Sequence, residues 1–142
     1  MRLWDVKTKN ELYAFGEQEH SLSGVSFINK EKYAIAGVNS YKKDTAYFLS
    51  LWDIASGKRL RSFGGQTNGV KSLAVSPDAR SFVTGNGDGA VRLWDIERDQ
   101  ELYRFDGHKD PYVCVAYSPN GQFILSGSSD STVRVWRLPR QP

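Results

Sequence analysis

Apolar and charged residues alternate in three short segments of the chain, at residues 11–15, 59–63 and 101–105. This period of two is typical of half-exposed β-strands. After a polar loop, each segment is followed by a more continuous apolar run, at residues 22–28, 70–75 and 112–117. Small residues are interleaved with the apolar ones there, which favours an inner strand covered on both faces. No segment has the pattern of an amphipathic helix, so we predict an all-β chain.

The most regular stretch of the sequence covers residues 82–96. It reads as a strand, a glycine-rich turn around Asp88, and a second strand ending in Trp94-Asp95, and it recurs 42 residues later at 124–138. The four tryptophans, at positions 4, 52, 94 and 136, are spaced 48, 42 and 42 residues apart. A fixed period of this length is the signature of a repeat architecture.

The repeat predicts units of four antiparallel strands. We place a partial unit at 1–15 and further units at 16–63, 64–105 and 106–142. The last unit lacks its outer strand unless residues 11–15 supply it. The extra six residues of the first full unit fall in an enlarged hairpin around 39–45. A recognition loop and a neutral surface insertion are both compatible with it.

Composition narrows the functional classes. The 142 residues carry a net charge of only +3, with acids and bases interspersed, which argues against a nucleic-acid partner. The single Cys114 excludes an internal disulfide and a cysteine zinc site, and it fits a reducing compartment. No apolar run is long enough to cross a membrane, and the first seven residues are too charged for a signal peptide. We therefore expect a cytoplasmic protein without cofactor, metal or membrane contact.

Several motif elements recur in phase with the repeat: Gly107-His108, Ser118-Pro119-Asn120-Gly121, Ser126-Gly127-Ser128, Asp130 and Val133-Arg134-Val135-Trp136. Together they closely resemble the tryptophan–aspartate (WD) repeat of β-propeller proteins, and the resemblance covers essentially the whole chain. It implies blades of four strands around a central channel, with the innermost strand first.

The resemblance also implies a buried hydrogen-bond network in each blade, made of a His, a Ser or Thr, an Asp and the Trp. The last unit supplies all four, as His108, Ser126, Asp130 and Trp136. The chemistry is reasonable, because a buried indole N–H needs an acceptor and a hydroxyl can accept it and donate onward. The same residue types occur in Ser-His-Asp hydrolases, but their repeat-fixed positions favour the structural interpretation.

This network weakens toward the N-terminus. The middle unit keeps Thr84, Asp88 and Trp94, with Gln66 at the His position. The first full unit has Trp52 but Gln18 and Ala36 at the His and Ser positions, and Ala46 where an Asp is expected, with Asp44 a candidate substitute. His20 is not at the His position, and we expect a solvated loop residue. The first unit should be the loosest.

Three blades are fewer than the four to eight of closed propellers. The chain therefore predicts an incomplete ring of about three blades with exposed apolar blade faces. Either two chains close a six-bladed ring as a homodimer, or further blades of a longer chain complete it.

The predicted function is a non-catalytic scaffold that binds proteins or peptides on a propeller face. By resemblance, the binding positions lie at the start of the inner strands and just before the turn Asp: Ser21, Ser23, Gly69, Lys71, Gly87, Pro111, Val113 and Ser129. Asp110 and Tyr112 are rim candidates, although for Tyr112 we favour packing between blades. The alternatives are a regulatory or targeting segment of a larger protein and an enzyme using the channel, which would need converging acids, His or metal ligands.

Overall fold

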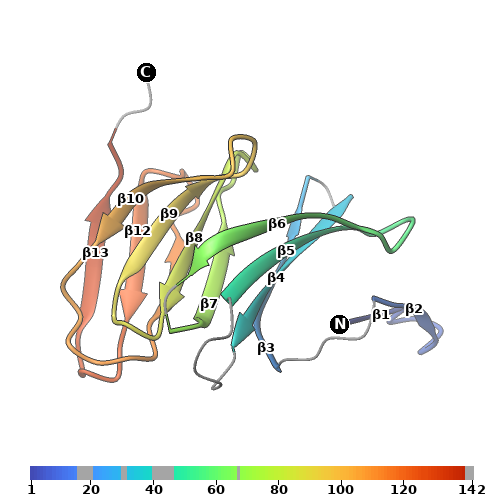
Figure 1. Ribbon diagram of the computed structural model, residues 1–142, viewed down its shortest axis with the longest axis horizontal. Coiled ribbons are helices and arrows are strands. Elements are labelled where there is room, and N and C mark those ends of the chain that lie inside the picture. Colours follow the sequence, from blue (N-terminus) through green and yellow to red (C-terminus); the bar gives the residue numbers. More distant parts are fainter. Residues whose placement is uncertain (16–20, 30–31, 40–46, 67, 140–142) are drawn as a thin grey trace.

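The structure is a computed structural model that describes residues 1–15, 21–29, 32–39, 47–66 and 68–139. Every regular element in this part of the chain is a β-strand (Figure 1). In the N-terminal half these are β1 (Arg2–Trp4), β2 (Glu11–Ala14), β3 (Ser21–Ile28), β4 (Tyr33–Asn39), β5 (Tyr47–Asp53) and β6 (Arg59–Gln66). In the C-terminal half they are β7 (Val70–Val75), β8 (Ser81–Asn86), β9 (Val91–Asp95), β10 (Gln100–Phe105), β11 (Cys114–Tyr117), β12 (Phe123–Gly127) and β13 (Val133–Arg137).

The described strands form antiparallel sheets that follow one another in a row (Figure 1). We call them the N-terminal hairpin (β1-β2), the first sheet (β3-β4-β5-β6), the middle sheet (β7-β8-β9-β10) and the last sheet (β11-β12-β13). Each strand pairs with its sequence neighbour, so no connection crosses a sheet. The predicted fold class is confirmed, since these are propeller-like blades of antiparallel strands that do not close into a ring.

The middle sheet is covered on both faces, which explains why β8 is buried at every position. Strand alternation directs Phe82 and Trp94 to one face and Val83 and Leu93 to the other. The first pair joins an apolar cluster with residues of the first sheet, namely Ile28, Ile35, Leu49, Leu51 and Phe63. The second pair packs with Val113 and Ile124 on the side of the last sheet. Two cores therefore hold three sheets together.

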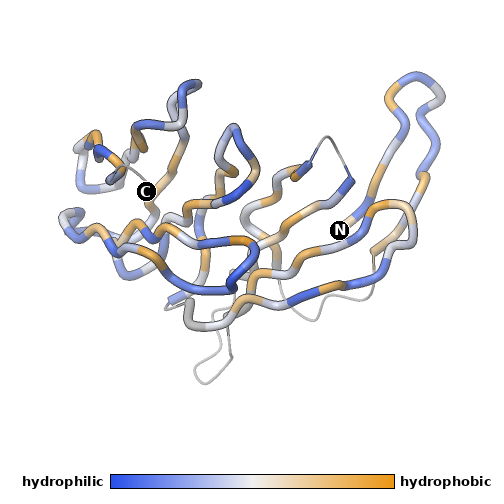
Figure 2. Tube along the Cα trace, turned by 90° about the horizontal axis from the view of Figure 1, so that it is seen from above, coloured by the Kyte–Doolittle hydropathy of each residue, from blue (hydrophilic) through white to orange (hydrophobic). Residues whose placement is uncertain are grey.

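Aromatic side chains at the outer strands reach the neighbouring sheet. Phe63 of β6 lies 5.1 Å from Phe82, and Phe105 of β10 lies 5.4 Å from Trp136, measured between ring centroids. Phe15, just after β2, lies 6.0 Å from Trp52 in the same way. Figure 2 shows the complementary pattern, with hydrophilic residues gathered at the turns and hydrophobic ones within the strands.

Two expectations about the inner strands need correction. The apolar run 112–117 becomes strand only from Cys114, because Tyr112 has a left-handed backbone with φ 69°. Coverage on both faces holds for the middle sheet but not for its neighbours: Val25 and Phe27 of β3 are exposed, as are Cys114 and Ala116 of β11. These strands have a neighbouring sheet on one side only.

The supply of an outer strand by residues 11–15 is not seen in the structure. β2 pairs with β1 instead, with Leu3 opposite Tyr13, and the last sheet has three described strands. The hairpin and the last sheet lie at opposite ends of the row (Figure 1). Three blades, the last sheet included, are too few to bring the ends together.

Candidate interaction face and its supporting network

The tryptophan of the last sheet is anchored by a chain of hydrogen bonds. The Trp136 Nε1–H donates to Ser126 Oγ at 2.8 Å, and Ser126 Oγ lies 2.8 Å from His108 Nε2. His108 Nδ1 lies 3.0 Å from Asp130 Oδ2. One arrangement satisfies every group: His108 Nδ1–H donates to Asp130, and the serine hydroxyl donates to Nε2. The chain ties β12 and β13 to the loop before β11.

Asp130 is held as a carboxylate by several donors. The Thr132 hydroxyl donates to it at 2.6 Å, the Lys109 backbone N–H at 3.0 Å, and His108 completes the set. These hydrogen bonds, that from Thr132 first, hold the pKa of Asp130 well below its usual range.

Ser126 is poorly placed to act as a nucleophile. Its side chain is buried, and its oxygen already accepts the indole N–H. A nucleophilic serine needs access to a substrate carbonyl, and Ser126 is only 1% exposed. The geometry therefore assigns this Ser-His-Asp set to packing of the tryptophan.

In the middle sheet, an asparagine rather than a histidine is the second partner of the hydroxyl that accepts from the tryptophan. Trp94 Nε1 donates to Thr84 Oγ1 at 3.3 Å, and Asn86 Nδ2 donates to the same oxygen at 3.1 Å. Asn86 is fully buried, so its amide stands in for an imidazole next to Thr84. The side chain of Gln66, predicted for this role, lies outside the described residues. Sequence reasoning missed Asn86, although its place two residues after Thr84 and just before the turn was a signal.

Asp88 pairs with arginines. Arg92 donates to it from Nη1 at 3.1 Å and Nη2 at 2.6 Å, and the Arg104 guanidinium lies 3.5 Å away. Arg92 is itself buried, with Glu101 at 3.5 Å as a second acid. A buried guanidinium requires such pairing, because an unpaired buried charge is costly. Asp88 thus joins the turn to β9 and β10.

In the first sheet, Trp52 has no hydrogen-bond acceptor for its buried Nε1–H among the described residues. Ala36 occupies the position of Thr84 and Ser126, so the hydroxyl is missing there. The proposed partners at positions 18, 44 and 46, and also His20, lie outside the described residues.

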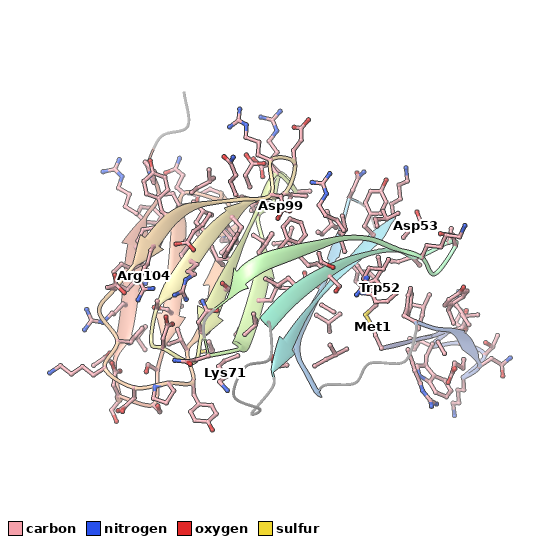
Figure 3. The ribbon with its side chains drawn as sticks, viewed as in Figure 1. Met1, Trp52, Asp53, Lys71, Asp99 and Arg104 are labelled. Carbon is pink, nitrogen blue, oxygen red and sulfur yellow. The ribbon has the colours of Figure 1, made fainter. Side chains whose placement is uncertain are left out.

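An aromatic surface is built where the last sheet meets the middle one. Lys71 Nζ lies 5.0 Å from the centroid of the Tyr112 ring, close enough for a cation–π contact. Tyr112 is 58% exposed. Our preference for packing between blades was therefore wrong, and the exposed ring stands on a left-handed backbone with φ 69°. Lys71 lies at the end of the middle sheet opposite to Asp99 (Figure 3).

The loop that carries Tyr112 is fixed by two serines from the β12–β13 turn. Ser129 Oγ donates to the Pro111 carbonyl at 2.6 Å, and Ser128 Oγ donates to the Asp110 carbonyl at 3.3 Å. Both Pro111 and Ser129 are exposed. We refer to Lys71, Asp110, Pro111, Tyr112 and Ser129 as the Tyr112 surface.

The other predicted binding positions have internal contacts. Val113 is only 1% exposed and belongs to the core, so it presents no side chain to a partner. Gly69 is buried and its carbonyl accepts the Gly87 N–H at 3.0 Å. Ser23 Oγ donates to the Val70 carbonyl, which joins the first and middle sheets. The side chain of Ser21 lies outside the described part.

The sequence model described as "WD domain, G-beta repeat" matches residues 57–95 and 99–137, more than half of the chain. The chain belongs to the WD-repeat family. Each match begins in the turn before an outer strand, β6 or β10, and ends with the third strand of the next sheet, β9 or β13. The hydrogen bonds around Trp94 and Trp136 therefore lie inside the matches.

Two relatives of this WD-repeat chain are subunits of larger size. It is 36% identical over 93 residues to guanine nucleotide-binding protein subunit beta-5b of Danio rerio, covering 64% of this chain and 22% of that protein. It is 47% identical over 36 residues to guanine nucleotide-binding protein subunit beta-1 of Caenorhabditis briggsae, covering 25% of this chain and 11% of that protein. The WD-repeat chain therefore spans no more than about a fifth of the length of these relatives. No helix in its described part is long and apolar enough to cross a membrane.

Proposed function

We propose that this WD-repeat chain is a non-catalytic scaffold that binds proteins or peptides at the Tyr112 surface. The observation that carries the proposal is the exposed ring of Tyr112 on a fixed, left-handed backbone beside Lys71. Residues held in this backbone region concentrate at functional sites. A rigid aromatic side chain offers a large contact area at low entropic cost, which is why tyrosine is enriched among binding hot spots.

Of the predicted positions, Lys71, Pro111 and Ser129 belong to this surface with their side chains. Gly69 and Gly87 contribute backbone beside it, and Ser21 and Ser23 mark the equivalent entry of the first sheet. The absence of a catalytic role is part of the proposal, supported by the use of Ser126 and His108 in anchoring Trp136.

We infer protein partners in the cytoplasm rather than nucleic acid or a membrane. The relatives are named as subunits, which supports a role for this chain within a protein complex. The small net charge of +3 supports the exclusion of nucleic acid. A role as a regulatory or targeting segment of a larger protein is the second candidate, favoured by the short share of each relative that the chain covers. Self-association, as a homodimer or with further blades, belongs to the same proposal.

The test is peptide selection followed by substitution. Peptides are selected from a random display library against the 142-residue protein, and their affinities are then measured for Tyr112→Ala. Loss of a hot-spot tyrosine is expected to weaken binding about tenfold or more, which corresponds to about 1.4 kcal/mol.

The matched control is Tyr33→Ala, because Lys32 Nζ lies 5.1 Å from the Tyr33 ring in a second cation–π pair remote from the Tyr112 surface. Peptides that bind the Tyr112→Ala protein as tightly as the unmodified one would refute the proposed site.

A further inference from the structure

The outer face of the last sheet carries apolar side chains at positions that are buried one repeat earlier. Leu125, Val133 and Val135 are 47%, 70% and 66% exposed. Their equivalents 42 residues earlier are Val83, Val91 and Leu93, which are 0%, 0% and 2% exposed because the last sheet covers them. The outer face of the last sheet is therefore of the type that receives another blade.

The first sheet presents the complementary type of face. Val25 and Phe27 are 61% and 54% exposed, and they stand opposite Ala36 and Ala34 on β4. By strand pairing, their equivalents in the last sheet are Val115 and Tyr117, opposite Ser126 and Ile124, and these pack against the middle sheet. The two ends of the row thus carry the two halves of the interface that already joins the middle and last sheets.

The N-terminal hairpin reproduces part of a blade in register. Arg2, Leu3 and Trp4 of β1 stand opposite Ala14, Tyr13 and Glu11. Arg92, Leu93 and Trp94 of β9 stand opposite Arg104, Tyr103 and Glu101, with the irregularity at the same place. The sequences agree as well: Glu11-Leu12-Tyr13-Ala14-Phe15 differs from Glu101-Leu102-Tyr103-Arg104-Phe105 at one position. β2 is an outer strand and β1 a third strand of the same kind as β9.

As a third strand, β1 is short and poorly covered. It is three residues long, and Trp4 is 52% exposed where Trp94 is buried. β13 offers the same residue types in the same order, as Arg134, Val135 and Trp136, and has no outer strand beside it among the described residues.

We propose that two copies of this chain exchange strands: β2 of one copy pairs with β13 of the other and displaces its own β1. Glu11 then lies opposite Trp136, Tyr13 opposite Val135, and Ala14 opposite Arg134. The last sheet of one copy packs on the first sheet of the other, which covers Val133 and Val135 on one side and Val25 and Phe27 on the other.

The exchange takes place between copies because β2 and β13 of one chain stand at opposite ends of the row (Figure 1). Two reciprocal exchanges give a two-fold ring of six four-stranded sheets, within the range of closed propellers. This inference rests on the self-association included in the proposed function and names the strands that perform it.

Cross-linking between singly substituted chains tests the register. In a Cys114→Ser background, one chain carries Ala14→Cys and the other Arg134→Cys. Mixing them under mild oxidation is expected to give a disulfide-linked pair of about twice 16.0 kDa. The register control replaces Arg134→Cys by Arg137→Cys, which is expected to give at most a small fraction of that product.

Two measurements by light scattering accompany it. Val135→Asp places a charge in the new interface and is expected to leave a monomer. Trp4→Ala weakens β1 and is expected to increase the dimer fraction, whereas general apolar stickiness predicts a decrease.

A monodisperse monomer of the unmodified chain at high concentration would overturn the proposal. A dimer that cross-links equally well in both registers would overturn the strand exchange while leaving self-association in place. Peptide binding at Tyr112 in the Val135→Asp monomer reports on the proposed function separately.

Discussion

At the scale of single residues, the three sheets differ in how they satisfy one indole N–H. Trp136 has a short bond to a serine that is itself part of a chain, Trp94 has a longer one to a threonine, and Trp52 has no acceptor in the described part of the protein. The cost of an unmade hydrogen bond in a buried place exceeds the gain from an ordinary one. The same tryptophan position therefore contributes progressively less stability toward the N-terminus.

Ser126→Ala tests the strongest of these anchors. It removes the acceptor of Trp136 and the partner of His108 Nε2, so a half-buried indole N–H and a buried imidazole lose their hydrogen bonds at once. We expect a loss of about 1–3 kcal/mol in the free energy of unfolding, measured by urea denaturation. Ser129→Ala, which removes one exposed hydroxyl, is the control. Equal effects of the two substitutions would contradict a structural role for the network.

Ala36→Ser tests the weakest anchor. A hydroxyl at this buried position stands where Thr84 and Ser126 receive their tryptophans, so it supplies the acceptor that Trp52 lacks. We expect a gain of about 1 kcal/mol in stability. In a Trp52→Phe background there is no indole N–H, and the gain should disappear. A loss of stability in both backgrounds would show that the site cannot hold the added oxygen.

Repeat spacing was enough to find the His108, Ser126, Asp130 and Trp136 set, because those side chains act within one unit. It did not find the burial of Arg92. In the sequence Arg92 alternates with apolar neighbours as a solvent-facing arginine does, yet the first sheet covers that face and forces the pairing with Asp88. Burial imposed by another sheet is not encoded in local alternation.

At the scale of elements, a tyrosine hydroxyl forms a polar contact between the middle and last sheets at the edge of their shared core. Tyr117 of β11 and Ser81 of β8 lie 2.9 Å apart between their hydroxyl oxygens. Burial between the sheets raises the pKa of Tyr117 to about 12. Between its ordinary value of about 10 and this value, the unfolded chain loses the proton and the folded one keeps it, so stability must fall as pH rises.

We predict that this alkaline loss of stability is reduced in Tyr117→Phe. The measurement is the denaturation midpoint as a function of pH from neutral to strongly alkaline conditions. Tyr103→Phe, an exposed tyrosine of β10, serves as the control and should keep the slope of the unmodified protein. An unchanged slope in Tyr117→Phe would mean that other groups titrate in this range.

The elements themselves were largely predictable from alternation and turn residues. The outer strands β2, β6 and β10 lie where the period of two placed them. The start of β11 was not predictable from the sequence. Tyr112 belongs to an apolar run that indicates a strand, and the run does not show that the φ of this residue is positive. The observed backbone depends on contacts with another turn: the Ser128 and Ser129 hydroxyls of the β12–β13 connection donate to the carbonyls of Asp110 and Pro111.

At the scale of the whole molecule, stability should follow coverage. The middle sheet has a neighbour on both faces, the first and last sheets have less, and the N-terminal hairpin contacts the first sheet through Phe15 and Tyr13. Regions with few buried apolar contacts open at lower free energy than those at the centre of a core. The row of sheets is therefore expected to open from its ends.

Hydrogen exchange on the monomeric Val135→Asp protein measures this gradient without the effect of association. We expect the amides of β8 and β9 to exchange slowest and those of β1 and β2 fastest. The first sheet should exchange faster than the last, because Trp52 lacks the anchor that Trp136 has. Ala36→Ser provides the internal check: it should slow exchange in β3–β6 and leave the last sheet unchanged. Uniform protection across all four sheets would show that they unfold as one cooperative unit, and the predicted gradient would be wrong.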